Sequence, residues 1–293
     1  MTAGVLFFIV LAKKGLRLRR PPARQTPRAC MRSLFFKTMA LAAAVPFCCA
    51  AVALSGCGSR GSGVQSDVAE YPKRFATEEE KIVVFSEGRT QGFYAADGWS
   101  NYQMFNCEWN GANCNISQGV MNMSVTKAES TTNTGFGYYG AEYRSAQKFG
   151  YGFYAVCMKA ADCSGVISSF FTYTNGPWDE IDIEILGKNM RQVQFNYYTD
   201  GEGHHEYLYN LGFDASEDFH EYAFDWQPGS ITWYVDGTAV CRATDNIPSH
   251  PQHIMANVWN CTGHDGWSGR FDESSLPATA QYKWIAYSPA QQG

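Results

Sequence analysis

Three acidic residues alternate with isoleucines in one short segment of this 293-residue chain. Residues 178–187 read Trp-Asp-Glu-Ile-Asp-Ile-Glu-Ile-Leu-Gly, and this period of two predicts a β-strand, because successive side chains of a strand point to opposite faces of its sheet. Glu180, Asp182 and Glu184 would then share one face, while Asp179 and the three isoleucines share the other. Like charges on one face destabilise a strand, so we expect this acidic row to serve a function rather than the fold.

An edge strand or a metal site could also place three carboxylates on one strand face. Charged side chains protect the edge strand of a sheet from pairing with another chain, but Trp178 and the aromatic segments around the row favour a cleft that binds sugars. Carboxylates also bind hard cations such as Ca²⁺, but such sites usually include backbone carbonyls from a loop, which a straight strand cannot supply. We therefore predict no metal at the row.

Two carboxyl groups on a rigid surface are what glycoside hydrolysis requires. One acts as nucleophile or base, and the other protonates the departing oxygen. The Cα atoms of Glu180 and Glu184 would lie about 13 Å apart on a straight strand, at about 3.3 Å per residue, whereas retention of configuration requires carboxyl groups about 5–5.5 Å apart. Long side chains on a concave strand can close that gap, and the charge of Asp182 between them can keep a neighbouring carboxyl protonated.

The acidic row and several aromatic segments resemble glycoside hydrolase family 16, and within it the bacterial lichenases, which are endo-β-1,3-1,4-glucanases. The resemblance rests first on Glu-Ile-Asp-Ile-Glu, preceded by Trp-Asp and followed by Ile-Leu-Gly, and it covers about residues 90–288. The other segments follow in the lichenase order: Tyr151-Gly152-Phe153-Tyr154, Ser168-Ser169-Phe170-Phe171-Thr172-Tyr173, Val193-Gln194-Phe195-Asn196-Tyr197-Tyr198, Phe224-Asp225-Trp226-Gln227-Pro228, Trp233-Tyr234-Val235-Asp236-Gly237 and Asn257-Val258-Trp259-Asn260.

The resemblance implies a mechanism and a substrate. Glu180 would be the nucleophile, Glu184 the general acid and then base, and Asp182 the residue that tunes them, in an endo-acting enzyme that cleaves β-1,4 bonds of mixed-linkage β-1,3-1,4-glucan with retention. A xyloglucan-active or transglycosylating relative shares the five-residue pattern and remains an alternative. A non-catalytic glucan-binding jelly roll is a second alternative, although binding alone would not require an acidic row. Laminarinase-type members insert one residue before the second glutamate, where this chain has Ile183.

Substrate-binding residues are also carried over from the lichenases. Trp178 and Trp259 would stack on glucose rings, whose apolar faces suit an aromatic platform, with Phe171 and Tyr173 nearby. The implied partners for sugar hydroxyls are Asn101, Glu142, Arg144, Asn196, Tyr198 and Asn257. Independently of the resemblance, Asn196 and Tyr198 share a strand face with Gln194 by their period of two.

Residues from about 82 onward show many short alternating segments separated by turns, and no convincing amphipathic helix. Residues 120–125, 219–226 and 231–235 alternate, Pro228-Gly229 separates the last two, and Asp236-Gly237 predicts a further hairpin turn. This pattern predicts an all-β sandwich of two antiparallel sheets. The resemblance implies a β-jelly roll with a concave active-site cleft, in one catalytic domain over residues 82–293.

The first 57 residues differ in composition from the rest. They hold nine of the 23 Lys and Arg residues and no Asp or Glu, so the remainder carries 14 basic against 28 acidic residues. Residues 31–37 supply a basic region and residues 39–54 an apolar one, as in an export signal, and we expect translation to begin at Met31. Leu54-Ser55-Gly56-Cys57 resembles the lipobox of bacterial lipoproteins, in which the cysteine is lipidated. An apolar stretch of about 16 residues is short for a membrane-spanning anchor.

These features predict a membrane-anchored lipoprotein outside the cytoplasm, at the cell surface. The acidic remainder would repel the phosphates of nucleic acid, so we expect no nucleic-acid partner. We expect residues 58–81 to form a flexible tether and the domain to be a monomer that binds a neutral β-glucan. Lichenases commonly hold a structural Ca²⁺ partly through an Asp in a Tyr-Asp-Trp triplet of the final strand. This chain has Tyr282-Lys283-Trp284 there, so we predict no calcium and no other cofactor.

Ten cysteines divide between the two parts of the chain. Cys30, Cys48 and Cys49 would leave with the leader, and Cys57 would carry the lipid. In the lichenases, the position of Cys107 pairs with a cysteine where this chain has Gly140, so the resemblance implies that this disulfide cannot form. The six cysteines of the domain still permit disulfides in an exported protein, with Cys107–Cys114 and Cys157–Cys163 as local possibilities.

Overall fold

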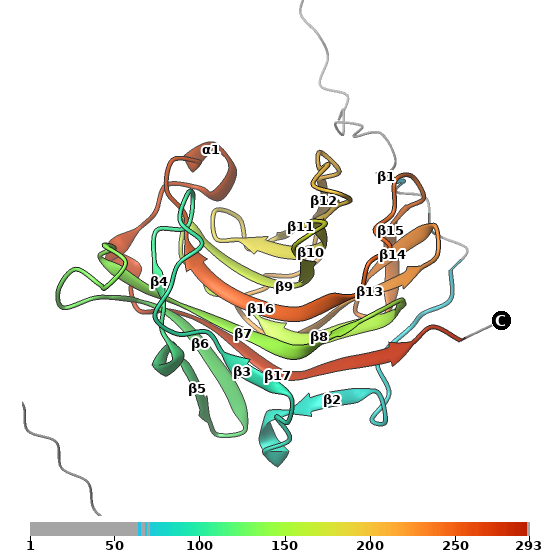
Figure 1. The fold of residues 1–293 in the computed structure, drawn as a ribbon, viewed down its shortest axis with the longest axis horizontal. Helices are drawn as coiled ribbons and strands as arrows, with labels where there is room; N and C mark the ends of the chain where they lie inside the picture. Colours follow the sequence, from blue (N-terminus) through green and yellow to red (C-terminus); the bar gives the residue numbers. More distant parts are fainter. Residues whose placement is uncertain (1–63, 66–67, 69–70, 292–293) are drawn as a thin grey trace, which may run out of the picture. The chain divides into compact units, whose positions relative to one another are not determined.

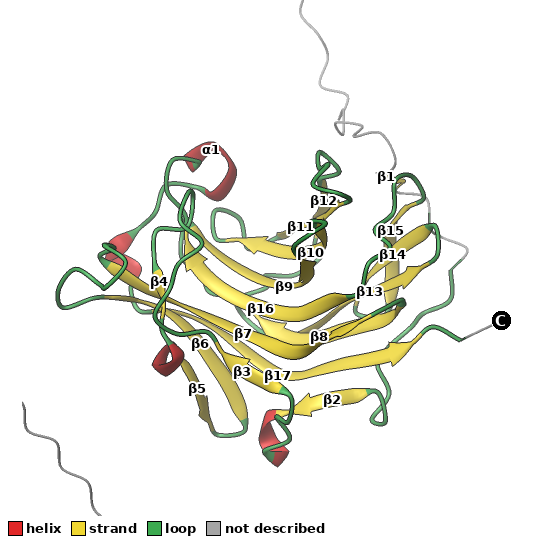
Figure 2. Ribbon diagram, in the orientation of Figure 1, coloured by secondary structure: helices red, strands yellow, loops and turns green. Residues whose placement is uncertain are grey.

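The computed structural model describes residues 64–65, 68 and 71–291. The predicted export signal, its Cys57 and much of the predicted tether lie outside these residues. Strands dominate, and the helical segments are short: α1 (Asp265–Ser268) and three 3-10 turns at Phe85–Glu87, Gly111–Asn113 and Glu273–Ser275, as Figure 2 shows. Among the described residues, no helix is long and apolar enough to cross a membrane.

Two curved sheets pack face to face (Figure 1). The front sheet has seven strands in antiparallel order: β3 (Phe93–Ala95), β7 (Tyr138–Phe149), β16 (Gln252–Asn260), β9 (Val166–Thr174), β10 (Asp179–Leu186), β11 (Gln192–Tyr198) and β12 (Tyr207–Asn210). The acidic segment is therefore strand β10, and it lies between β9 and β11. The acidic row is thus not a solvated edge of the sheet.

The back sheet runs in the order β1 (Val64–Gln65), β15 (Thr238–Ala243), β14 (Ser230–Val235), β13 (His220–Gln227), β8 (Gly152–Lys159) and β17 (Ala278–Pro289). The long strand β17 then pairs with β6 (Val120–Lys127) along one half and β2 (Lys81–Val84) along the other, and β5 (Cys114–Ser117) lies outside β6. The short strand β4 (Glu108–Trp109) pairs in parallel with β7 of the front sheet, the one parallel pairing among the described strands. This arrangement confirms the predicted two-sheet jelly roll.

The core between the sheets follows from the alternation in each strand. Ile181, Ile183 and Ile185 of β10 are fully buried, as their period predicted. They belong to one apolar cluster with back-sheet residues such as Phe224 and Trp233. The indole of Trp233 reaches across the core and donates a hydrogen bond of 3.2 Å to the backbone carbonyl of Asp182. The back sheet thus supports β10 directly beneath its acidic row.

The N-terminal strap, residues 71–81, packs on the outer face of the back sheet. Tyr71 and Ala76 pack on a second, smaller apolar cluster there, which includes Phe153 and Ala155. The backbone N–H of Ala76 donates to the carboxylate of Glu221 at 2.9 Å. We expected a flexible tether to extend to residue 81, but these residues make specific contacts with the domain.

The predicted turns and cysteines can be compared with the structure. Asp236 and Gly237 both have positive φ, 45° and 71°, which matches the predicted hairpin turn between β14 and β15. The six cysteines of the domain are all free, so neither Cys107–Cys114 nor Cys157–Cys163 is bonded and the suggested local disulfides are wrong. A Cβ placed on Gly140 would lie 2.7 Å from the sulfur of Cys107, so position 140 does face that thiol.

Candidate active site

An open cleft of 780 Å³ lies on the outer face of the front sheet. Its floor is made of alternate residues from neighbouring strands, because each strand points every second side chain away from the core. All thirteen residues that we predicted to act in catalysis or substrate binding line this one cleft: Asn101, Glu142, Arg144, Phe171, Tyr173, Trp178, Glu180, Asp182, Glu184, Asn196, Tyr198, Asn257 and Trp259.

Strand pairing sets the neighbours of each carboxylate. Glu180 lies opposite Tyr173 on β9 and Tyr198 on β11, and Asp182 lies opposite Phe171 and Asn196. Glu184 lies opposite Ser169 and Gln194. The acidic row therefore has an aromatic end at Glu180 and a polar end at Glu184, and the two glutamates occupy different environments on one strand.

All three carboxyl groups of the row are shifted toward their protonated forms. Burial raises the pKa of Glu180 to about 7, although hydrogen bonds from Trp178 and Asp182 oppose this rise. Burial and then the charge of Glu180 raise the pKa of Glu184 to about 8. Burial and the charges of both glutamates also raise the pKa of Asp182. At neutral pH the row therefore holds protons, which acid catalysis requires.

Each glutamate accepts a hydrogen bond from a residue beside it. The indole N–H of Trp178 donates to Oε2 of Glu180 at 2.7 Å. The amide of Gln194 donates to Oε2 of Glu184 at 3.0 Å, and Gln194 in turn accepts a hydrogen bond of 3.1 Å from the indole of Trp267. These bonds fix the orientation of both carboxyl groups from opposite ends of the row.

A polar group lies on the β7 and β16 side of the cleft. Glu142 is buried, and Arg144 contacts it at 3.3 Å between Nη1 and Oε1. Burial raises the pKa of Glu142 to about 7 against the opposing effects of Arg144 and Asn257. Ser169 donates a hydrogen bond of 2.5 Å to Oδ1 of Asn257. These side chains present donors and acceptors along the floor, as sugar hydroxyls require.

Of the two tryptophans predicted to stack on glucose rings, Trp178 is exposed in the cleft and Trp259 is buried. The rings of Trp178 and Tyr198 are stacked, with centroids 4.6 Å apart and planes 14° apart. Flat apolar surfaces of this kind suit the C–H faces of sugar rings. Trp259 also lines the cleft, but it is only 3% exposed, because it stacks on Phe105 with centroids 3.9 Å apart and lies 6.1 Å from the ring of Trp267. Little of its ring is therefore open to a sugar.

Several residues that also line the cleft were not predicted from the sequence, and they are Trp99, Gln103, Met104, Phe105, Asn175, Glu206, Met255, His264 and Trp267, with Ser169 and Gln194 named only within strand patterns. Most lie in loops, where no periodicity indicates which way a side chain points. Met255 alone could have been found from the alternation on β16, since it lies two residues before Asn257.

The end of β10 requires the glycine of the Ile-Leu-Gly segment. A Cβ on Gly187 would lie 1.8 Å from the backbone oxygen of Cys163, so any larger residue would push the chain away from β9. Gly187 also donates to the backbone oxygen of Val166 at 2.8 Å. This close approach fixes the end of the strand beyond Glu184.

Lys283 stands at the position where the lichenase resemblance implies an acidic calcium ligand. Lys283 is exposed on β17, and its Nζ lies 4.0 Å from the ring centroid of Phe219. A lysine ammonium above an aromatic face is a stable arrangement without a metal. The absence of calcium remains a prediction.

The chain was compared with protein families and with known proteins. The model of glycosyl hydrolases family 16 matches residues 101–285. A beta-glucanase from Paenibacillus polymyxa is 54% identical over 199 residues, which cover 66% of this chain and 81% of that protein. A solved prokaryotic β-1,3-1,4-glucanase (lichenase) from a mouse hindgut metagenome is 51% identical with a TM-score of 0.67, covering 71% of this chain and 98% of that one.

A second solved structure, the beta-glucanase of Bacillus licheniformis, is 47% identical with a TM-score of 0.66 and covers 71% of this chain and 97% of its own. The family match extends over more than half of the chain, and the matched region contains the whole acidic strand and every residue that lines the cleft except Trp99. This chain therefore belongs to family 16 of the glycosyl hydrolases.

Proposed function

We propose that the protein is an endo-acting, retaining β-glucanase that hydrolyses β-1,4 bonds in mixed-linkage β-1,3-1,4-glucan. The observation that carries the proposal is the row of Glu180, Asp182 and Glu184 on the cleft face of β10, with all three pKa values raised. The substrate is supported by the identity of 51% to a solved lichenase. The open cleft also suits the interior of a polymer, since it does not close around a chain end.

In the first step, Glu184 and Glu180 act together on the glycosidic bond. Glu184 holds a proton because its pKa is raised to about 8, and it donates this proton to the departing oxygen as the C–O bond breaks. The carboxylate of Glu180 attacks the anomeric carbon from the opposite face and forms a glycosyl ester. Asp182 keeps its proton in a hydrogen bond to Glu180, which favours the charged form of the nucleophile.

In the second step, Glu184 acts as a base. It takes a proton from a water molecule, whose oxygen attacks the anomeric carbon and breaks the ester bond to Glu180. Both glutamates return to their starting forms, and two inversions give net retention. The hydrogen bond from Gln194 holds Glu184 in place through both steps.

The deciding experiment measures reducing-sugar release from barley β-glucan, laminarin, carboxymethylcellulose and xyloglucan. We expect activity on the barley glucan and little on the other three. Preference for xyloglucan, or transfer to added oligosaccharides in place of hydrolysis, would support the alternative family members. Binding without hydrolysis, or full activity of Glu180→Gln, would refute the proposed mechanism.

The anchor is proposed separately from the activity. The lipobox-like Leu54-Ser55-Gly56-Cys57 and the basic and apolar segments before it support lipidation of Cys57 and a position outside the cytoplasm, bound to a membrane. Labelling of cells with a radioactive fatty acid tests this, because Cys57→Ser should abolish incorporation into the protein. Equal labelling of the wild type and the variant would refute it. Gel filtration of the domain tests the proposed monomer.

A further inference from the structure

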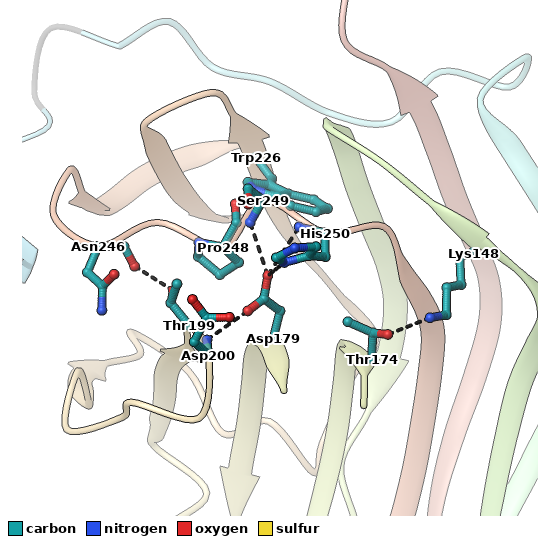
Figure 3. Close-up of polar contacts among 10 residues, drawn as sticks. All are labelled: Lys148, Thr174, Asp179, Thr199, Asp200, Trp226, Asn246, Pro248, Ser249 and His250. Carbon is teal, nitrogen blue, oxygen red and sulfur yellow. Dashed lines mark hydrogen bonds and ion pairs between the residues drawn. The ribbon is translucent and has the colours of Figure 1, made fainter. Parts of the chain in front are cut away.

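Asp179, the residue between Trp178 and Glu180, has a side chain that is fully buried on the core side of β10. Its carboxylate is bonded from several directions (Figure 3). Oδ1 accepts from the backbone N–H of Asp200 at 2.9 Å, and Oδ2 accepts from the backbone N–H groups of Ser249 and His250, both at 3.1 Å. Nδ1 of His250 lies 2.9 Å from Oδ2 and must be the donor, because a carboxylate oxygen can only accept.

These bonds join three segments that are far apart in the sequence. They connect the start of β10, the turn at residues 199–202 after β11, and the loop at residues 244–251 before β16. The turn and the loop also contact each other, through a hydrogen bond of 2.5 Å from Thr199 to the backbone oxygen of Asn246. Trp226 of the back sheet donates to the carbonyl of Pro248 at 2.8 Å, which ties the loop to the back sheet (Figure 3).

A metal ion does not account for this cluster. Asp179, Asp200 and His250 bring possible ligand atoms within 4.8 Å of one another. However, N–H groups already point at both oxygens of Asp179, one at Oδ1 and the others at Oδ2, so the carboxylate has donors without a cation. Burial raises the pKa of Asp179, but these hydrogen bonds outweigh burial and lower it. The N–H donors stabilise the charge without a cation.

The cluster around Asp179 continues to the catalytic row through Trp178. The turn bonded to Asp179 also donates from the N–H of Gly201 to the carbonyl of Trp178 at 2.8 Å. The indole ring is stacked on Tyr198, and a Cβ placed on Gly201 would lie 3.6 Å from its Cε3. Trp178 is therefore held by the turn and by Tyr198, and in that position its N–H points at Oε2 of Glu180.

We propose that Asp179 is a positioning residue, which holds Trp178 in place through the turn at residues 199–202 and thereby fixes the indole hydrogen bond to the nucleophile Glu180. This inference rests on the proposed function, because it assigns Asp179 to the reaction of that site. An asparagine could not replace it. Its amide offers one acceptor oxygen, and its NH₂ group would face N–H donors.

Three variants test the proposal. Asp179→Asn should lower kcat/KM on barley glucan by about tenfold or more, since small displacements of catalytic groups cost up to about 100-fold. His250→Phe keeps a ring but removes one of the donors, and it should give a smaller loss of the same kind. His250→Asn can place its amide N–H near the position of Nδ1 and should recover most of the wild-type activity.

Two readouts separate positioning from general stability. The indole ¹H–¹⁵N signal of Trp178, assigned through Trp178→Phe, should move upfield in Asp179→Asn as its hydrogen bond to Glu180 weakens. The acidic limb of kcat/KM on an activated aryl glycoside should move to higher pH, because Glu180 would lose a bond that favours its charged form. Asp214→Asn, which removes a carboxylate bonded only within a distant loop, should change neither readout.

The outcomes distinguish this inference from the proposed function. A wild-type protein without activity on any of the glucans would refute the function but leave the indole signal as a test of the role of Asp179. If Asp179→Asn and His250→Phe fold, lose melting temperature and yet keep the wild-type indole signal and acidic limb, Asp179 is merely structural and the proposal fails. If Asp179→Asn does not fold, the comparison of His250→Phe with His250→Asn decides the question in the same way.

Discussion

At the scale of single residues, strand β10 places two chemically identical side chains, Glu180 and Glu184, in different surroundings. Glu180 accepts its hydrogen bond from an indole and Glu184 from an amide. The pKa of Glu184 is raised to about 8 and that of Glu180 to about 7, so the acid keeps its proton more firmly than the nucleophile. The order of these values agrees with the roles that the sequence resemblance implied.

Replacing the acid should affect substrates according to their leaving groups. Glu184→Gln should lower kcat on barley glucan by about 100-fold to 10,000-fold, the usual contribution of acid catalysis, but should barely change formation of the glycosyl ester from a dinitrophenyl glycoside. Steady-state and burst kinetics on both substrates measure this difference. The exposed Glu217→Gln serves as the control. Equal losses on both substrates would show that Glu184 is not the acid.

The raised pKa values also predict how stability changes with pH. An unfolded glutamate has a pKa near 4.5, so between about pH 4.5 and 8 the folded protein holds a proton on Glu184 that the unfolded chain has lost. This proton contributes to the free energy of unfolding. The contribution is greatest below pH 4.5 and is lost as the pH rises to 8. The free energy of unfolding of Glu184→Gln should therefore exceed that of the wild type at pH 8 by about 4 kcal/mol, and the two should be nearly equal at pH 4.

Urea unfolding at pH 4, 6 and 8 measures the difference in free energy of unfolding between the wild type and Glu184→Gln. Thermal unfolding is a second measurement, in which one kcal/mol corresponds to about 2–4 °C in melting temperature for a domain of this size. The same difference between wild type and variant at every pH would contradict a proton on Glu184 in the folded state.

At the scale of elements, the alternation of β10 was fully predictable and the loops were not. A period of two fixes which side of a strand faces the core once the isoleucines are recognised. The loop with Trp99 and Phe105 has no such period, and it is held by distant contacts such as the bond of 2.9 Å from the N–H of Asn106 to the carbonyl of Asn260. Trp267 likewise reaches Gln194 only because the chain folds back through α1. Such contacts arise from tertiary structure and leave no local pattern.

The loop after β11 provides a test at this scale. A Cβ on Gly203 would lie 2.3 Å from Cε1 of Tyr198, so Gly203→Ala should displace that ring from its stack on Trp178. We expect KM for barley glucan to rise several-fold, because the platform would lose its flat shape, with a smaller change in melting temperature. Gly212→Ala, whose Cβ would meet nothing within 4 Å, is the matched control. An unchanged KM in Gly203→Ala would argue that Tyr198 does not contact the substrate.

At the scale of the whole molecule, the sequence predicted the two-sheet sandwich but misplaced the boundary of its ordered part. Residues 71–81 are polar and charged, which is typical of a linker. The structure shows how such a segment becomes ordered. The guanidinium carbon of Arg74 lies 4.0 Å from the ring centroid of Phe153, and the same group pairs with Glu80. The positive charge is therefore compensated within the protein. Composition alone cannot reveal a partner that lies on a different strand.

Calcium dependence is a property of the whole domain. Because Lys283 occupies the position of the expected acidic ligand, we expect a chelator to leave the melting temperature of the wild type unchanged. Lys283→Asp should acquire a calcium-dependent increase in melting temperature, which scanning calorimetry with and without the chelator would detect. A large chelator-induced decrease in the wild type would refute the prediction.

The N-terminal strap has a consequence for how the enzyme meets its substrate. The strap packs on the outer face of the back sheet, and the cleft opens on the outer face of the front sheet. The strap and the cleft thus lie on opposite outer faces of the sandwich, with both sheets between them. None of residues 71–81 lines the cleft, so a glucan fibre can lie along the whole length of the front sheet without meeting the strap.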